Sequence, residues 1–233
     1  MAVGVLTVFE EPGIRTLQSL LESRVLSQKP QIGYIRLHNS LGDTNLIAAF
    51  DSALDSLKST KGLILDMRDT PTGGNTTVAR AIMERFIDQT MSCQRHSVPA
   101  EERAYGVKRS WIEEASPRGS FCYSAPVVVL VDHWTGGQGG EGVAVGLGGM
   151  NRTRTVGTAM ARLLGATDSV LLPNSRIHIH YPAEKLFHVN GKPRETFLPT
   201  VSIDLLSSSA LRSEDPILQS GIDILNRIMK IDV

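Results

Sequence analysis

The chain has 233 residues, of which 41% are hydrophobic, enough to bury the core of one large domain or two small ones. Its 24 basic and 24 acidic residues cancel, which argues against nucleic acid or an anionic membrane surface as the partner. No stretch approaches the roughly 18 apolar residues of a membrane span. Residues 3–9 are too short an apolar run for a secretory signal. We therefore expect no membrane span, and either a cytoplasmic location or export with a signal outside this chain.

Residues 1–30 are predicted to form an N-terminal helical segment, and residues 31–233 a single α/β domain. Leu17 and Val25 fall on one face of a helix over residues 14–27, and a proline shortly afterwards ends the pattern.

The main domain is predicted to begin with a strand, a helix and a second strand. Residues 32–38 alternate apolar and other side chains, and residues 63–68 form an apolar core strand. Five apolar side chains between them fall on one helix face: Leu46, Ile47, Phe50, Leu54 and Leu57. This order and length predict a parallel pair of strands.

The most apolar strand is predicted over residues 127–131, where four of five side chains are β-branched, as in a strand buried on both faces. It ends at Asp132, and five glycines follow within residues 136–142. Gly73 and Gly74 similarly follow the preceding strand, and Asn75 or Thr76 can cap the helix after them. Since the carboxyl ends of parallel strands share one edge, both loops should border one crevice, where backbone N–H groups can approach a substrate.

The remaining segments are predicted to complete and cover this sheet. Residues 88–125 are mixed in composition and read as a surface insertion or cover. Further strands are expected over residues 153–158, 170–172 and 177–181, and a final helix begins at Pro216.

Several pieces of the chain, in order, carry a family resemblance: residues 32–37, residues 61–69 with Gly73 and Gly74, residues 126–131, Glu141, residues 155–158, residues 198–201 and residues 215–218. Together they resemble the tail-specific, or C-terminal-processing, serine peptidases, which are related to the tricorn core protease and the interphotoreceptor retinoid-binding protein. The resemblance implies a ClpP/crotonase-like layered α/β fold with a mostly parallel central sheet, in a single domain without a PDZ insert. It also implies a peptide or unfolded protein as substrate, and no cofactor.

The family's chemistry uses a serine in the loop after the central strand, about three residues before the position of Glu141. Its hydroxyl attacks a peptide carbonyl while a nearby base takes the proton. Here the matching position is Gly137 or Gln138, depending on a one-residue shift of the alignment, and neither side chain is a nucleophile. Thr135 is the only hydroxyl inside the loop and lies two or three residues early.

In the branch with a Ser–Lys dyad, a lysine follows the strand over residues 153–158. This chain has Arg162 in that region, and arginine stays protonated and cannot serve as a base. The resemblance to the tricorn-like branch instead implies a serine that works with a histidine from the first strand and a glutamate before the last strand. His38 and Glu195 match those positions and are predicted to be the base and its orienting acid. The alternatives are a histidine bonded to backbone and a solvated carboxylate.

The remaining site residues are predicted from their place in the two loops. The oxyanion is expected to be held by backbone N–H groups of three glycines, namely Gly73, Gly74 and Gly139. The substrate pocket is expected to be shaped by His133, Trp134 and Thr135. His178 and His180 share one strand face without a third ligand at suitable spacing, so no metal site is predicted.

Two functions follow as alternatives from these residues. The first is a serine-type peptidase domain that acts on or recognises peptides by acyl-transfer chemistry, inactive if the nucleophile is truly absent. The second is a non-catalytic domain that binds peptides or apolar ligands on the same fold. Acyl chemistry of the crotonase kind is a weaker third. Substrate sequence, homo-oligomerisation and the origin of the missing serine stay open.

Overall fold

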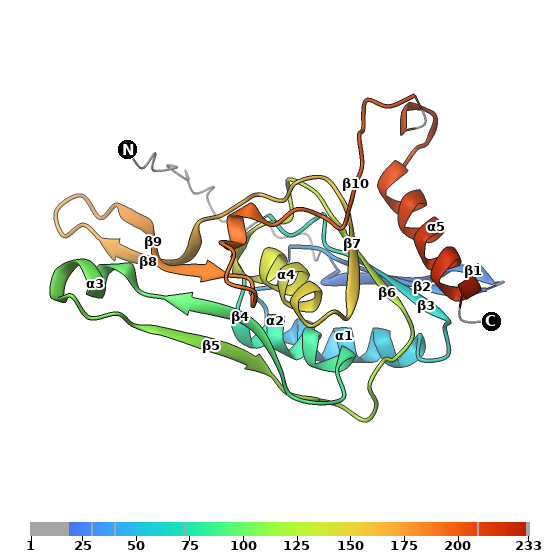
Figure 1. Ribbon diagram of the computed structural model, residues 1–233, viewed down its shortest axis with the longest axis horizontal. Coiled ribbons are helices and arrows are strands. Elements are labelled where there is room, and N and C mark those ends of the chain that lie inside the picture. The colour runs from blue at the N-terminus through green and yellow to red at the C-terminus, as the bar shows by residue number, and fades with distance from the viewer. Residues whose placement is uncertain (1–18, 29, 40, 72, 209, 232–233) are drawn as a thin grey trace.

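The computed structural model describes residues 19–28, 30–39, 41–71, 73–208 and 210–231 (Figure 1). Its central sheet has six strands in the order β1-β2-β3-β6-β7-β10. These strands are β1 (Leu21–Gln28), β2 (Gln31–Leu37), β3 (Gly62–Asp66), β6 (Val127–Val131), β7 (Thr153–Gly157) and β10 (Val201–Ser202). All neighbours from β2 to β10 pair in parallel, and only β1 is antiparallel. The predicted layered fold with a mostly parallel sheet is confirmed.

Helices cover both faces of this sheet. They are α1 (Asn45–Ser56), α2 (Thr76–Met83), α4 (Gly142–Gly149) and α5 (Pro216–Ile231). Leu65 and Val129 enter the core shared with α1, α2 and α4, whereas Ile64 and Val128 enter a second core beneath α5. Because alternate side chains point to opposite faces, a strand between two cores must be apolar at every position. This explains the continuous apolar runs of β3 and β6.

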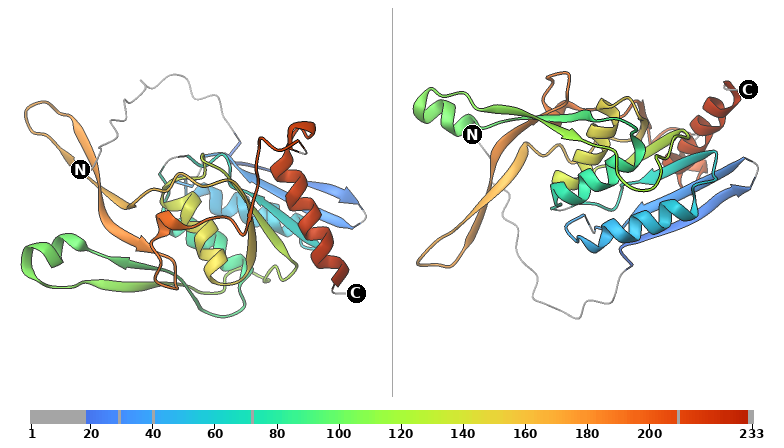
Figure 2. Two further views of the ribbon diagram at one scale, coloured as in Figure 1. Left: turned by 45° about the horizontal axis from the view of Figure 1, so that its top comes forward. Right: turned by 90° about the horizontal axis from the view of Figure 1, so that it is seen from below.

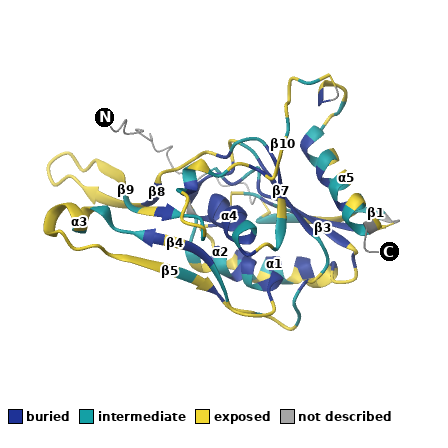
Figure 3. Ribbon diagram, viewed as in Figure 1, coloured by how far each residue is buried: buried dark blue, intermediate teal, exposed yellow. Residues whose placement is uncertain are grey.

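A second sheet has the order β5-β4-β9-β8 and is antiparallel throughout. Its strands are β4 (Met91–Ser97), β5 (Ser110–Ala115), β8 (Gly165–Leu171) and β9 (His178–Phe187). Together with α3 (Pro99–Tyr105) it projects from one end of the molecule, as Figure 2 shows. Its outer half is exposed, in contrast to the main sheet (Figure 3). The segment over residues 88–125, predicted as an insertion or cover, supplies β4, α3 and β5.

Two sequence-based expectations need correction. The helix predicted over residues 14–27 is wrong where the structure describes it, because Leu21–Gln28 is a strand paired with β2. Residues 14–18 lie outside the described residues. The helical spacing of leucines was overridden by pairing with the edge of the main sheet, where Arg24 also stacks over the Tyr34 ring at 4.5 Å. The strands predicted over 170–172 and 177–181 exist but are longer.

Two expected helix starts are confirmed. Asn75 caps α2, since its side-chain oxygen accepts the Thr77 N–H at 2.8 Å. The final helix begins at Pro216. Within the described ranges, no helix combines the length and the apolar character needed to cross a bilayer.

Candidate functional site

Loops from three strands meet beyond the carboxyl ends of β2, β3 and β6. The Asn39 N–H donates to the Asp69 carbonyl at 2.5 Å, which joins the loops after β2 and β3. The Gly136 N–H donates to the Thr70 carbonyl at 2.9 Å, which joins the loops after β3 and β6. The two glycine-bearing loops therefore lie side by side at one sheet edge, where open α/β sheets bind ligands.

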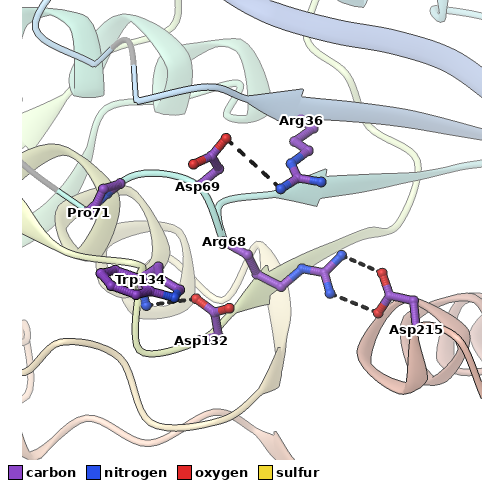
Figure 4. Close-up of a pocket in the computed structure, with 7 residues that line it drawn as sticks. All are labelled: Arg36, Arg68, Asp69, Pro71, Asp132, Trp134 and Asp215. Atoms are coloured by element: carbon purple, nitrogen blue, oxygen red, sulfur yellow. Dashed lines mark hydrogen bonds and ion pairs between the residues drawn. The ribbon is translucent and has the colours of Figure 1, made fainter.

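A cavity of about 350 Å³ opens at this edge (Figure 4). It is lined by Arg36, Arg68, Asp69, Pro71, Asp132, Trp134 and Asp215. Arg68 makes a two-bond fork with Asp215, at 2.8 and 2.7 Å, and also reaches both oxygens of Asp66. Bidentate pairing of this kind fixes the guanidinium plane, so Arg68 ties the end of β3 to the start of α5 and forms a rigid wall.

The wall continues into the core through Asp66. The Tyr34 hydroxyl donates to the fully buried Asp66 carboxylate at 2.8 Å. Burial, and then the Asp66 charge, raise the pKa of Tyr34 above its ordinary value. Tyr34 therefore stays protonated and supports the wall without titrating at neutral pH.

His38 lies at the end of β2 and pairs with Asp69. Its Nδ1 is 3.1 Å from the Asp69 carboxylate, and its side chain is 23% exposed. The Arg36 guanidinium lies 4.0 Å from the same carboxylate oxygen. A carboxylate on Nδ1 holds the imidazole in the tautomer whose Nε2 accepts a proton, as in a catalytic triad.

Glu195, the predicted acid partner of His38, lies in the short turn Arg194–Thr196. It lines a second cavity of about 560 Å³, and its Oε2 is buried with no hydrogen-bond partner among the described residues. The contact expected between His38 and Glu195 is made instead by Asp69. A role for Glu195 toward His38 stays a prediction.

Glu141 connects the turn carrying Glu195 to the central loop. Its carboxylate accepts the N–H groups of Arg162 and Leu163 at 2.5 and 3.2 Å, and it pairs with Arg194 at 3.3 Å. Burial raises the pKa of Glu141 although Arg194 acts in the opposite direction. This buried group fixes the start of α4 against the segment after β7 and the turn Arg194–Thr196.

The two candidate nucleophile positions differ in their backbone. Gly137 has φ +66°, and a Cβ atom there would lie 2.0 Å from the carbonyl oxygen of Gly73. Only glycine fits that conformation. Gln138, the next residue of the π-helical turn Gly137–Glu141, already carries a side chain. The close approach of Gly73 therefore excludes a serine at 137, and 138 is the position of the two that already has a Cβ atom.

Thr135 has its hydroxyl engaged inside the loop. The side chain is fully buried, donates to the Met67 carbonyl at 3.1 Å and accepts the Asp132 N–H at 3.0 Å. These bonds hold the ends of β3 and β6 together. Contact of Thr135 with the substrate stays a prediction.

The predicted oxyanion glycines pack against one another. Gly73 and Gly74 have φ values of +63° and +120°, and the Gly139 N–H points to the Gly73 carbonyl at 3.4 Å. A Cβ atom on Gly139 would lie 2.7 Å from Leu41. Close packing of backbones accounts for the glycines here, and donation to an oxyanion stays a prediction.

The order of these elements matches a known family along most of the chain. Residues 31–203 match the model of peptidase family S41. The chain belongs to this family. A search of curated proteins found no significant match.

Solved structures of similar fold include several peptidases. A putative peptidase from Parabacteroides merdae superposes with a TM-score of 0.70 at 19% identity, over 90% of this chain and 65% of that one. The photosystem II D1 C-terminal processing protease gives 0.64 at 19% identity, over 82% of this chain and 50% of that one. Mature CPAF gives 0.65 at 16% identity, over 89% and 52%. The S41 chain thus spans about half to two thirds of these proteins, and such identities show the fold alone.

Trp134 lines the cavity of the S41 domain, and the ring of His133 lies beside it. Their rings lie 4.7 Å apart, and Trp134 is 56% exposed although it lines the cavity. An exposed indole beside a cavity suits contact with a ligand. The role of His133 and Trp134 in substrate binding stays a prediction, and the exposed indole beside the cavity supports it.

Two carboxylates at the candidate site of the S41 domain are not predicted from the sequence. Asp69 contacts His38, and Asp132 lines the cavity with a pKa that burial raises although the Trp134 N–H donates to it. Each follows the end of a buried strand, within three residues of β3 and directly after β6. Position after a strand was the available signal, since parallel strands deliver such side chains to the ligand edge.

Proposed function

We propose that this S41 domain recognises extended peptide segments at the edge formed by the loops after β2, β3 and β6. It keeps the base of a serine-peptidase site and lacks the nucleophile. The observation that carries the proposal is the His38–Asp69 pair, at 3.1 Å, on loops hydrogen-bonded to the central glycine loop. A histidine oriented by a carboxylate beside backbone N–H donors is the arrangement that acyl transfer requires.

The missing part of this arrangement is a hydroxyl at position 138. A serine there would give its proton to Nε2 of His38 as its oxygen attacks a peptide carbonyl. Backbone N–H groups of Gly73 and Gly74 would hold the oxyanion, joined by that of Gly139 if it leaves the Gly73 carbonyl, and the imidazolium would then protonate the leaving amine. Water would release the acyl group by the same steps.

The test is to introduce Gln138→Ser and Gly137→Ser separately. We expect only Gln138→Ser to hydrolyse an unstructured fluorogenic peptide and to react with a fluorophosphonate probe, because Cβ at 137 collides with Gly73. Adding His38→Ala to Gln138→Ser should lower the rate at least about 100-fold, the usual contribution of a general base. Gln138→Ala is the matched control for a change of size alone.

Lack of both hydrolysis and labelling in folded Gln138→Ser would contradict latent peptidase chemistry. The second candidate function, non-catalytic binding of peptides or apolar ligands, would then remain. It is favoured by the absence of a hydroxyl at positions 137 and 138 and by the engaged hydroxyl of Thr135. It predicts saturable peptide binding by the unmodified chain without product. Processing of C-terminal tails and homo-oligomerisation belong to the same proposal.

A further inference from the structure

The hairpin of β8 and β9 carries large apolar side chains that the described chain leaves uncovered. It projects beyond the main sheet together with α3 (Figures 1 and 2). Five of these side chains are between 36% and 53% exposed, namely Val170, Leu172, Ile177, Ile179 and Tyr181. Contiguous apolar surface of this kind marks an interaction site more often than chance exposure.

All five lie on one face of the hairpin. Val170 pairs with Ile179 and Asp168 with Tyr181, and the Leu172 N–H donates to the Ile177 carbonyl. Residues directly opposite in an antiparallel pair point to the same side, and alternate residues share a face.

The opposite face of the hairpin is mostly polar. It carries Ser169, His178 and His180 along with Leu171. The apolar residues are therefore sorted onto one side, which a solvated hairpin does not require.

The apolar face leads into the second cavity. Tyr181 and Asp168 of the hairpin line this space of about 560 Å³, and Pro99 at the start of α3 lines it from another element. Glu195 and Leu164 line it as well. Leu164 directly follows the segment that Glu141 holds by its backbone. The hairpin face is thus continuous with the turn carrying Glu195 next to the central loop.

We infer that the apolar face of the β8–β9 hairpin and the adjoining cavity bind an extended peptide segment with apolar side chains at alternate positions. This inference rests on the proposed function and names the substrate class of that site. Within the described chain β8 is the edge strand of its sheet, so alternate backbone groups of β8 are available to pair with a peptide.

An extended peptide fits the geometry better than a second copy of the chain. The cavity is concave and takes its lining from α3, the hairpin and the turn at Glu195, so a narrow segment enters it whereas a globular surface does not. The two-residue repeat of an added strand would place every second side chain toward the apolar face. Arg103 and Lys185 accompany Asp168 and Glu195 in the lining, a mixed set suited to main-chain amides.

The experiment measures binding of two fluorescein-labelled peptides by anisotropy. One alternates valine and serine, and the other has the same composition in two blocks. We expect the alternating peptide to bind about 10-fold more tightly, because only it presents all its valines to one face.

Variants locate the binding face. Ile179→Ser and, independently, Val170→Ser should weaken the alternating peptide about 10-fold each through lost apolar burial. Leu206→Ser is the matched control, because Leu206 is 84% exposed in the loop between β10 and α5, and it should leave binding within about 2-fold. Circular dichroism establishes that each variant is folded.

Three results would overturn the inference: equal binding of both peptides, binding unaffected by both hairpin variants, or a concentration-dependent dimer of the unmodified chain that Ile179→Ser abolishes. The last would make a second copy the occupant. Because binding needs no nucleophile, these results are independent of hydrolysis by Gln138→Ser. Tight hairpin-dependent binding without hydrolysis would refute the proposed chemistry alone.

Discussion

The two sheets of this molecule are built from strands of opposite character. β3 and β6 are buried at every position, whereas β8 is buried only at its first two residues and exposed at the remaining five. The main sheet is therefore held by apolar packing on two faces. The projecting sheet joins this core at its root through Cys93 and Ala115 and leaves its outer half exposed (Figure 3). We therefore expect stability to come mainly from the first sheet, and the proposed recognition to use the loops and the hairpin.

The largest expected effect is at the junction of the two regions, where Arg194 pairs with Glu141 in the interior. Three nitrogens of Arg194 are buried without a hydrogen-bond partner among the described residues. Arg194→Met should lower the free energy of unfolding by about 3 kcal/mol, because it leaves the buried carboxylate of Glu141 without its cation. The double variant Arg194→Met with Glu141→Gln should recover much of this loss in urea titrations. If the double variant is as unstable as the single one, charge pairing is not what holds the junction.

A matched pair of leucines separates the sheets directly. Leu65→Ala in β3 should cost about 3 kcal/mol of unfolding free energy, since it leaves a cavity between packed helices and sheet. Leu171→Ala in β8, at a side chain 42% exposed, should cost less than about 0.5 kcal/mol. Thermal or urea unfolding measures both. Similar losses of unfolding free energy in the two variants would show that the Leu171 side chain is also packed in the isolated protein.

The smallest expected effect is a pH dependence of the stability of the projecting sheet, and it centres on His96 in β4. Its two ring nitrogens lie 2.9 Å from Glu184 and 3.1 Å from Glu113, on β9 and β5. Burial disfavours the charged forms of both His96 and Glu113, but the hydrogen bonds that the imidazole donates to the carboxylates outweigh it, so the pKa of His96 is raised and that of Glu113 is lowered. Gln94 and Arg80 also contact Glu113.

The raised pKa sets the sign of the effect. The stability from His96 is fully present below its unfolded pKa and is lost as pH rises through the folded pKa. The part from Glu113 is lost as pH falls through its own lowered pKa. Trp111 stacks on His96 at 4.7 Å, so its fluorescence should follow this titration in a Trp134→Phe background. His96→Gln should abolish the part of the change that lies above the ordinary pKa of histidine. A titration that persists in His96→Gln would assign it to another group.

Many elements were predictable because their signals are local. The apolar runs of β3 and β6 identify strands between two layers of helices. Asn75, a residue type that caps helices, marks the start of α2. β1 was mistaken for helix, because the spacing of a few leucines cannot reveal that the edge of a sheet lies beside them. The strands predicted over residues 170–172 and 177–181 cover only the outer ends of β8 and β9. Their inner residues, 165–169 and 182–187, mix polar and charged residues with a proline and follow no apolar pattern.

The sequence by itself determined a layered α/β domain of a serine-peptidase kind, two glycine loops at one sheet edge, and a central loop with no hydroxyl at positions 137 and 138. Periodicity and residue type suffice for the order of strands, helices and loops, because these follow from which face of each element is buried. The serine-peptidase kind follows instead from the resemblance of these segments to a known family. Only the tertiary structure decided that Asp69 contacts His38, that Gly137 admits no side chain, and that Glu141 pairs with Arg194. Such contacts depend on positions to within an ångström, and those are set by packing between segments far apart in the chain.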